Sequence, residues 1–368
     1  MKVIVAMSGG VDSSVAAYLL KKQGVEVTGL TFELWDSRDL ERSNVCCSVE
    51  TIEIAKSAAR KLGIEHYTVD VRDAFYSKVI ENFCESYLQG TTPNPCILCN
   101  KYIKFNFLLQ KARELEADFV ATGHYARVIH SRESAKAYRD TPNSPPDRNL
   151  LLKGVDSKKD QSYALYVIKQ EELAKTLFPL GGMNKKETRK IAVELGLANA
   201  LRPESQEICF VGNDKYADFV KGFSPEALKP GPIVDTEGNN IGEHRGIAFY
   251  TIGQRRGLGI ASLKPHYVVS IDLHNNTVVA GTQEDAMRKN FKVRELNWIS
   301  QGGLAGPMRA DVRIRSMMDP MPSTISPEND GEIAVEFDVP QWAPAPGQSA
   351  VFYDGDIVLG GGIIDNMD

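Results

Sequence analysis

The chain has 368 residues, of which 42% are hydrophobic and 25% charged, and a formal net charge of −5, a composition typical of a globular protein of two or three domains. It contains no stretch of about 20 apolar residues and no apolar or Arg-rich leader, so we expect a cytoplasmic protein without a membrane segment. The small negative charge weakly disfavours a polyanionic partner but does not exclude a local basic patch.

The first predicted elements flank a Gly-rich turn. An apolar strand at Val3–Ala6 leads into SGGVDSS at 8–14, and a helix is predicted over Val15–Gln23, ended by Gly24. This order forms an anion site because glycines let the backbone approach a phosphate and the first helical turn leaves N–H groups without partners. Three serines add hydroxyl donors. The turn lacks the lysine of a Walker loop, so γ-phosphate transfer is not indicated. A simple capped turn is the weaker alternative.

Strands and helices alternate as far as about residue 201. Predicted strands are Val3–Ala6, Val25–Thr31, Glu65–Val69, Phe119–Thr122 and Leu150–Lys153, and further predicted helices are Thr51–Leu62, Ala74–Leu88, Tyr102–Leu115 and Gln170–Leu177. This rhythm predicts an α/β fold with a doubly wound parallel sheet, whose ligands bind beyond the carboxyl ends of the strands. The polar, Pro-rich segment 131–149 is predicted to be a surface insertion.

The pattern then changes twice. A mixed α+β region follows, with a helix at Tyr216–Gly222 and β-rich pieces at Ala248–Ile252 and Tyr267–Asp272. Closely spaced strands dominate the last part, at Lys292–Leu296, Met308–Ile314, Gly331–Phe337, Ser349–Tyr353 and Asp356–Ile363, as in a small β-barrel. We therefore predict three domains with boundaries at 1–202, 203–285 and 286–368.

Six cysteines in a cytoplasmic chain are more often catalytic, metal-binding or inert than paired in disulfides. Cys96 and Cys99 form a C-x-x-C in a Pro- and Asn-rich loop ahead of a predicted helix, whose N-terminus favours thiolate. Cys209 follows a Pro-containing irregular segment. Among the others, Cys84 is predicted to be a core thiol, and no role is predicted for Cys46 and Cys47.

Four chemistries compete for these thiols. Structural zinc requires more Cys or His pairs than the chain offers, and a thioredoxin-type dithiol would follow the first strand directly. An iron–sulfur cluster on Cys96, Cys99 and Cys209 stays open. We favour a pair of catalytic thiols, Cys99 and Cys209, brought together in space.

Several long runs match one family. AMSGGVDSSVAA, TPNPCILCNKYIKF, ATGHYAR, DSKKDQSYALY, SQEICFVG, GEHRGIAFYTIGQRRGLGI and PGQSAVFYDGD resemble the bacterial tRNA-specific 2-thiouridylases, which are PP-loop ATP pyrophosphatases. The resemblance spans nearly the whole chain. It implies an ATP-binding PP-loop domain, a small central adaptor domain and a C-terminal β-barrel that helps to hold tRNA. It also implies adenylation of O2 of the wobble uridine, then sulfur transfer that yields 2-thiouridine, AMP and pyrophosphate.

The resemblance also implies residue roles. Cys209 corresponds to the cysteine that carries the persulfide, and Cys99 to the nucleophile that resolves it and can form a disulfide with it. The implied ATP contacts are Ala6, Met7, Ser8, Gly9, Gly10, Val11, Asp12, Ser13, Phe32 and Gly123. The implied tRNA contacts are Asn94, Pro95 and Cys96 at the target base, and His124, Lys159, Asp160, Gln161, Arg315 and Gln348 elsewhere.

The implied cofactor is ATP with Mg²⁺, without a resident metal. The implied partners are tRNAs with glutamate, lysine and glutamine anticodons and a persulfide donor, either a cysteine desulfurase or a relay protein. Candidate phosphate contacts are Lys101, Lys104, Lys158, Lys159, Arg255 and Arg256. Two alternatives stay open: an amide- or lysidine-forming PP-loop enzyme, which would need neither Cys99 nor Cys209, and a non-enzymatic RNA-binding protein with a degenerate loop.

Overall fold

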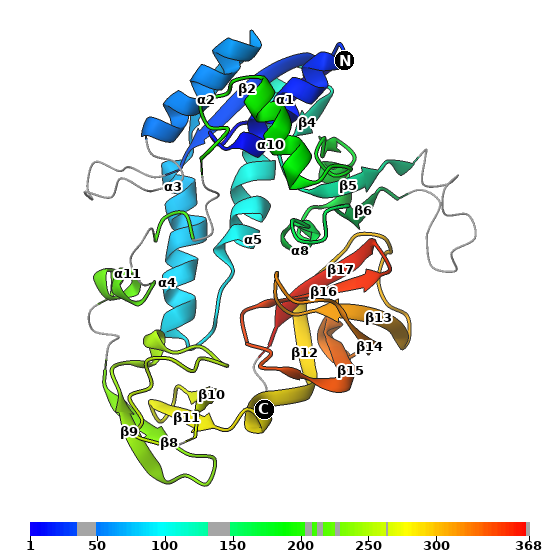
Figure 1. Ribbon diagram of the computed structural model, residues 1–368. Coiled ribbons are helices and arrows are strands. Elements are labelled where there is room, and N and C mark those ends of the chain that lie inside the picture. Colours follow the sequence, from blue (N-terminus) through cyan, green and yellow to red (C-terminus); the bar gives the residue numbers. More distant parts are fainter. Residues whose placement is uncertain are drawn as a thin grey trace.

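The computed structural model describes residues 1–34, 49–131, 148–202, 208–211, 216–224, 229–262 and 264–365. Most of the predicted insertion at 131–149 lies outside these ranges, as do Cys46 and Cys47. Within the described residues the strands form a parallel sheet, a small central sheet and a barrel sheet (Figure 1).

The parallel sheet confirms the predicted fold class. Its strand order is β3-β2-β1-β4-β7, and every neighbouring pair is parallel. The strands are β1 (Lys2–Ala6), β2 (Glu26–Glu33), β3 (Glu65–Asp70), β4 (Phe119–Ala121) and β7 (Thr176–Leu177). The central position of β1 places the loop that follows it in the middle of the carboxyl edge, where ligands of such sheets bind.

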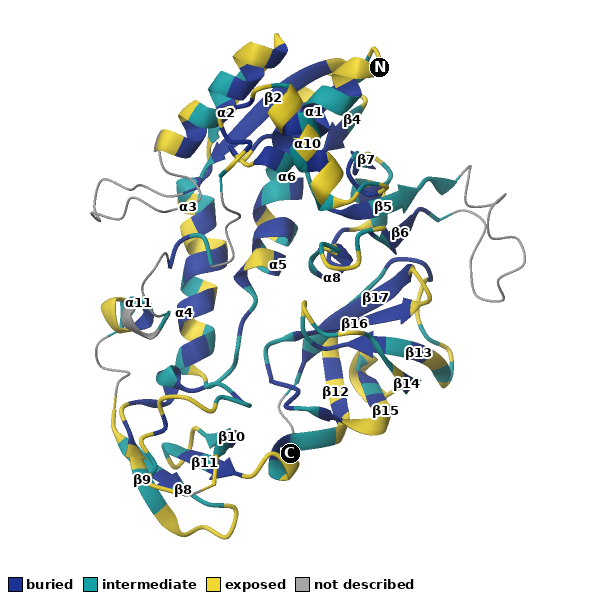
Figure 2. Cartoon of the chain, in the orientation of Figure 1, coloured by how far each residue is buried: buried dark blue, intermediate teal, exposed yellow. Residues whose placement is uncertain are grey.

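Helices cover both faces of this sheet because the side chains of β1 alternate between two buried clusters (Figure 2). Val3 and Val5 pack with α1, α2 and α10, whereas Ile4 packs on the opposite face with α4 and α6. The helices are α1 (Val11–Lys22), α2 (Val49–Leu62), α3 (Arg72–Phe75), α4 (Glu81–Leu88), α5 (Pro95–Cys99), α6 (Phe105–Glu114), α8 (Ser162–Leu165), α9 (Gln170–Leu173) and α10 (Lys185–Glu194). One π-helical turn joins α3 to α4 and another joins α5 to α6.

Two predictions for this region were wrong. Leu150–Lys153 is a strand, β6, but it pairs antiparallel with β5 (Ala126–Ile129) and joins the barrel sheet, where Leu152 lies opposite Ile357. An apolar run of this length does not reveal which sheet it enters. The predicted helix at 170–177 ends with α9, and its last two residues form β7, the fifth parallel strand. A strand of two residues is too short to show a period.

The predicted barrel is confirmed. Six antiparallel strands follow the order β12-β15-β14-β13-β16-β17, and β12 pairs with β17 to close the ring. They are β12 (Met287–Trp298), β13 (Met308–Arg313), β14 (Met321–Pro327), β15 (Ile333–Trp342), β16 (Ser349–Asp354) and β17 (Ile357–Ile364). The sequence did not predict β14, because MPSTISP is rich in residues typical of turns.

The central sheet has the order β10-β11-β8-β9. Its strands are β8 (Gly231–Val234), β9 (Asn240–His244), β10 (Tyr267–Asp272) and β11 (Thr277–Gly281), preceded by α11 (Tyr216–Phe223). The predicted β-rich piece at 248–252 is not a strand, since Ile247–Phe249 forms a 3₁₀ turn. The α3–α4 run extends from the parallel sheet to this central sheet (Figure 1). Among the described helices, none is both long and apolar enough to span a bilayer.

Candidate nucleotide and thiol site

The loop after β1 has the geometry of an anion site. Gly9 adopts φ +75°, and a Cβ there would lie 2.5 Å from the carbonyl oxygen of Thr51, so only glycine fits. Gly10 is the N-cap of α1 and supplies no side-chain cap. No side chain of the N-cap therefore competes with a phosphate for the N–H groups of the first helical turn.

Two loop serines bond within the loop. Ser13 Oγ accepts from the Ser8 N–H at 3.2 Å and donates to the Gly10 carbonyl at 3.1 Å, and Ser14 Oγ donates to the same carbonyl at 3.1 Å. Both serines are buried. Their hydroxyls therefore shape the loop, and their predicted role as phosphate donors stays a prediction.

Two other predicted nucleotide contacts adjoin this loop or its edge of the sheet. A Cβ at Gly123 would lie 2.6 Å from the Ser13 nitrogen, so the segment 122–124 packs directly against the start of α1. Phe32 ends up at the carboxyl end of β2 with its side chain buried in the apolar cluster. Behind the loop, the buried Asn199 side chain donates to the Gly9 carbonyl at 2.8 Å. The sequence did not point to this amide.

The Asp12 side chain bonds to two other segments of the chain. Its carboxylate oxygens each lie 2.7 Å from Lys185 Nζ at the start of α10. The Tyr125 hydroxyl lies 2.9 Å from Asp12 Oδ1 and 3.0 Å from Thr188 Oγ1. No role was predicted for Lys185, Tyr125 or Thr188. Tyr125 stood inside the matched run ATGHYAR, but no motif marked Lys185.

Cys99 lies on α5 and Cys209 on the short segment 208–211, and both pack in one apolar cluster. Cys99 is buried in this cluster, and the half-buried Cys209 packs against it. Phe210 fixes the neighbouring backbone, because its ring is fully buried and packs edge-on against Phe83 with centroids 5.1 Å apart. The structure therefore brings the two predicted thiols to the same cluster. Among the described cysteines none is in a disulfide.

The C-x-x-C lies on a helix rather than in the predicted loop. Asn94 is the N-cap of α5 and accepts from the Ile97 N–H at 3.4 Å, and Pro95 occupies the first helical turn. Cys96, in the first turn of α5, is exposed, whereas Cys99 at the end of the helix is buried. The Asn-Pro pair is itself a helix-start signal, so the predicted loop at Cys96 and Cys99 was wrong.

Cys84 is the core thiol that the sequence predicted. Its side chain is fully buried on α4, and burial raises its pKa to about 12. It is therefore a protonated, unreactive thiol near neutral pH.

The segment 122–125 contacts both the nucleotide loop and the helical run that begins with α5, the helix of Cys96 and Cys99, and continues into α6. We call this run (Pro95–Glu114) the thiol helix. The ring of His124 stacks on Phe105 of α6, with centroids 6.3 Å apart and planes at 23°. Burial, with Lys104 nearby, lowers the pKa of His124 to about 3. The imidazole is therefore neutral near pH 7, and its Nδ1 lies 2.7 Å from Thr122 Oγ1. The next residue, Tyr125, contacts Asp12.

The predicted tRNA segment 159–161 is fixed from two sides. The Tyr125 N–H donates to Gln161 Oε1 at 3.0 Å. Asp160 accepts from the N–H groups of Gly154 and Ser162, each at 3.0 Å, and its Oδ2 lies 2.8 Å from Arg313 NH1 of the barrel. The side chain of Asp160 is only 3% exposed and that of Arg313 only 8%.

Two predicted tRNA contacts in and beside the barrel also bond to the protein. Arg315 donates to the Ala343 carbonyl at 2.8 Å, and burial lowers its pKa. Gln348 Nε2 donates to the Thr92 carbonyl at 2.9 Å, and the Thr92 N–H donates to Pro346 O at 2.8 Å. The barrel therefore holds the segment that leads into α5.

Three family models match consecutive parts of the chain. They are described as tRNA methyl transferase HUP domain (residues 1–213), tRNA methyl transferase PRC-barrel domain (217–282) and Aminomethyltransferase beta-barrel domain (288–364). The chain is 48% identical over 365 residues to the tRNA-specific 2-thiouridylase MnmA of Clostridioides difficile (strain 630), covering 99% of this chain and 98% of that one. It is also 48% identical to the protein of that name from Acetivibrio thermocellus, covering 99% of each. The chain belongs to the tRNA-specific 2-thiouridylase family.

A solved 4-thiouridine synthetase–RNA complex with bound ATP is similar over 61% of this chain and 50% of that one. At 17% identity and a TM-score of 0.37, this likeness is too low to add to the family assignment.

The described thiols of this 2-thiouridylase family member show no grouping of metal ligands. In the ranges that the structure describes, which include Cys96, Cys99 and Cys209, no three His, Cys, Asp or Glu side chains converge as metal ligands. The arrangement therefore gives the iron–sulfur hypothesis no support.

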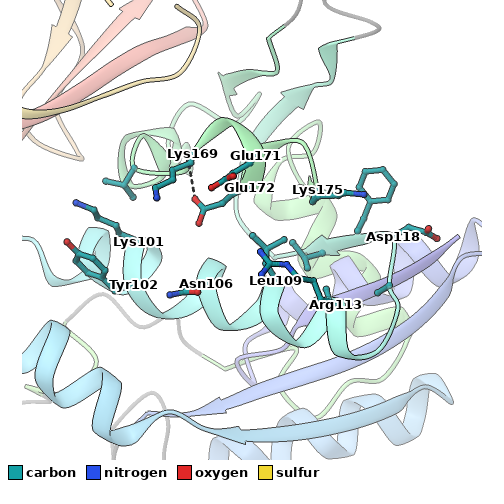
Figure 3. A pocket seen from close by; sticks show the side chains of 15 residues that line it. Lys101, Tyr102, Asn106, Leu109, Arg113, Asp118, Lys169, Glu171, Glu172 and Lys175 are labelled. Carbon is teal, nitrogen blue, oxygen red and sulfur yellow. Dashed lines mark hydrogen bonds between the residues drawn. The ribbon is translucent and has the colours of Figure 1, made fainter. Parts of the chain in front are cut away.

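A pocket of about 560 Å³ lies apart from the nucleotide loop (Figure 3). Lys101 and Arg113 line it from the helix that follows Cys99, and Glu171 and Glu172 face them from α9. Phe119, the first residue of β4, also lines it, so the pocket reaches the amino edge of the parallel sheet. Its walls mix both signs of charge, which favours neither an anion nor a cation.

Proposed function

We propose that this protein is an ATP-dependent tRNA 2-thiouridylase that acts on the wobble uridine. The observation that carries this proposal is the continuous set of contacts from the phosphate loop to the thiol helix. Asp12 contacts Tyr125, and the adjacent His124 stacks on the helix that follows Cys99. A nucleotide activated at the loop would thus lie near the thiols. The names of full-length relatives support the substrate.

In the first step, ATP binds with its pyrophosphate at the loop. The nucleotide contacts that we propose are residues 6–13, Phe32 and Gly123. Magnesium would be held mainly by phosphate oxygens and water, with Asp12 as the one carboxylate of the loop sequence. The uridine O2 attacks the α-phosphate and pyrophosphate leaves. This step is needed because O2 is a poor leaving group until it is adenylated.

In the second step, sulfur replaces the activated oxygen. We propose that Cys209 carries a persulfide, whose outer sulfur attacks C2 of the uracil as AMP leaves with the former O2. The Cys99 thiolate then attacks the Cys209 sulfur and frees the thiocarbonyl. Alternatively, Cys99 first releases hydrosulfide, which attacks C2. Either route leaves a Cys99–Cys209 disulfide that an external thiol reduces.

The target base must leave its stack to reach both sites, as in other enzymes that act on bases. We propose that Asn94, Pro95 and the exposed Cys96 face this base. Further proposed tRNA contacts are His124, Lys159, Asp160, Gln161, Arg315 and Gln348. Asp160, Gln161, Arg315 and Gln348 also bond to the protein in this structure, so each would contact tRNA through its remaining polar atoms or by exchanging these bonds. We retain domain boundaries at 1–202, 203–285 and 286–368, with the barrel as the tRNA-holding part.

The test follows both half-reactions. Unmodified tRNA with a glutamate, lysine or glutamine anticodon should trigger pyrophosphate release from ATP without any sulfur donor. Adding a persulfide donor should then yield 2-thiouridine, measured by mass spectrometry of digested tRNA. The matched control is the same tRNA with cytidine at the wobble position, which should yield neither product. A protein that binds this tRNA but releases no pyrophosphate would contradict the proposal.

A further inference from the structure

The phosphate loop lacks a cation of its own. Residues 8–14 contain no lysine or arginine and one acidic residue, Asp12, in the first turn of α1. ATP brings several negative charges to this turn. The helix N-terminus offsets only part of that charge, because its dipole contributes about half an elementary charge.

A distant lysine supplies the missing charge. Lys185 Nζ lies 2.7 Å from both carboxylate oxygens of Asp12, although 173 residues separate them. Its side chain is 12% exposed, against 31% for Asp12. The ammonium thus lies beside the first turn of α1, in a setting where charge interactions are stronger than in water.

The position of Lys185 on its own helix is unfavourable in isolation. It directly follows Asn184, the N-cap of α10, where the helix dipole disfavours a positive side chain. Asn184 and Glu187 form a capping box that fixes this helix start, and the Lys185 N–H donates to Asp156 at 3.0 Å. The fold therefore holds a lysine at a helix start and aims it at the phosphate loop.

We propose that Lys185 is the phosphate-binding cation of the ATP site, and that it exchanges the Asp12 carboxylate for an oxygen of the β- or γ-phosphate when ATP binds. Asp12 holds the ammonium in place before the nucleotide arrives. The released carboxylate keeps the contact from the Tyr125 hydroxyl. This inference rests on the proposed function, since it requires ATP as the substrate.

The test compares two nucleotides by calorimetry in the absence of tRNA. The α,β-methylene analogue of ATP has all three phosphates but cannot be cleaved between α and β, and AMP lacks the two outer phosphates. We expect Lys185→Met to weaken the analogue at least tenfold and AMP less than twofold. Lys185→Arg should stay within threefold of the wild type. Lys186→Met, which removes the same charge from the exposed next residue, should change neither affinity.

Equal weakening of both ligands, or no weakening, would overturn the inference. If Lys185→Met does not fold because the Asp12 carboxylate loses its partner, Asp12→Asn and Asp12→Asn/Lys185→Met provide the same comparison without that carboxylate. If the wild-type protein itself does not bind the ATP analogue, the proposed function fails. If it binds and Lys185→Met binds equally well, only this inference fails.

Discussion

The buried ion pair between Asp160 and Arg313 should be the strongest electrostatic contact between the catalytic part and the barrel. Asp160→Asn keeps an acceptor for the two N–H groups but turns an uncharged amide toward a guanidinium that is 8% exposed. Breaking one side of a buried pair costs about 3–5 kcal/mol. For a cooperative unit of about 150–250 residues, 3 kcal/mol lowers the melting temperature by roughly 6–12 °C.

The assay is thermal unfolding followed by circular dichroism. The matched control is Asp338→Asn, which breaks the Arg309–Asp338 pair of the same barrel, whose side chains are 60% and 49% exposed. Solvent screens that exposed pair, so its loss should change the melting temperature little. The double variant Asp160→Asn/Arg313→Met should be less destabilised than the sum of the single variants, because it leaves no unpaired buried charge.

Equal melting temperatures for Asp160→Asn and Asp338→Asn would refute this reasoning. The same variants also show whether Asp160 contacts tRNA directly or positions the segment 159–161. If Asp160 positions this segment, the loss of tRNA affinity in Asp160→Asn should follow the loss of the barrel contact, and Arg313→Met should reproduce it.

Three further outcomes are expected. Gly123→Ala should abolish binding of the ATP analogue, because its Cβ would lie 2.6 Å from a backbone nitrogen of the nucleotide loop; Gly182→Ala, in open space, is the control, and unchanged affinity in Gly123→Ala would contradict the packing argument. Cys209→Ser should release pyrophosphate with tRNA but form no 2-thiouridine; thiolated tRNA from this variant would show that another group carries the sulfur. Iodoacetamide at pH 8 should modify exposed Cys96 but not Cys84, whose raised pKa of about 12 keeps the thiolate scarce until far higher pH; peptide mass mapping that finds Cys84 alkylated first would contradict its burial.

The sequence predicted features that depend on local patterns. The β1–loop–α1 unit follows from an apolar run and paired glycines, and the core position of Cys84 follows from its apolar helix. It could not predict contacts between distant segments. The Lys185–Asp12 pair depends on how α10 docks against α1, and the partner of β6 depends on the barrel. The predicted loop at 94–99 was wrong for a local reason, because the Asn-Pro pair at 94–95 begins a helix.

The hairpin β5–β6 is synthesised long before β17, the strand on which it completes its sheet. Its inner strand, β6, pairs with β17 at Ile357, and Arg127 of the outer strand, β5, pairs with Asp356 across 229 residues of chain. A ribosome therefore exposes the apolar edge Leu150–Leu152 long before the strand that covers it has been made. A fragment that ends near residue 202 would keep this uncovered edge permanently and so present a template for self-association. The catalytic part and the barrel thus share one β-sheet where β6 pairs with β17. Truncating the chain at a domain boundary would remove part of that sheet.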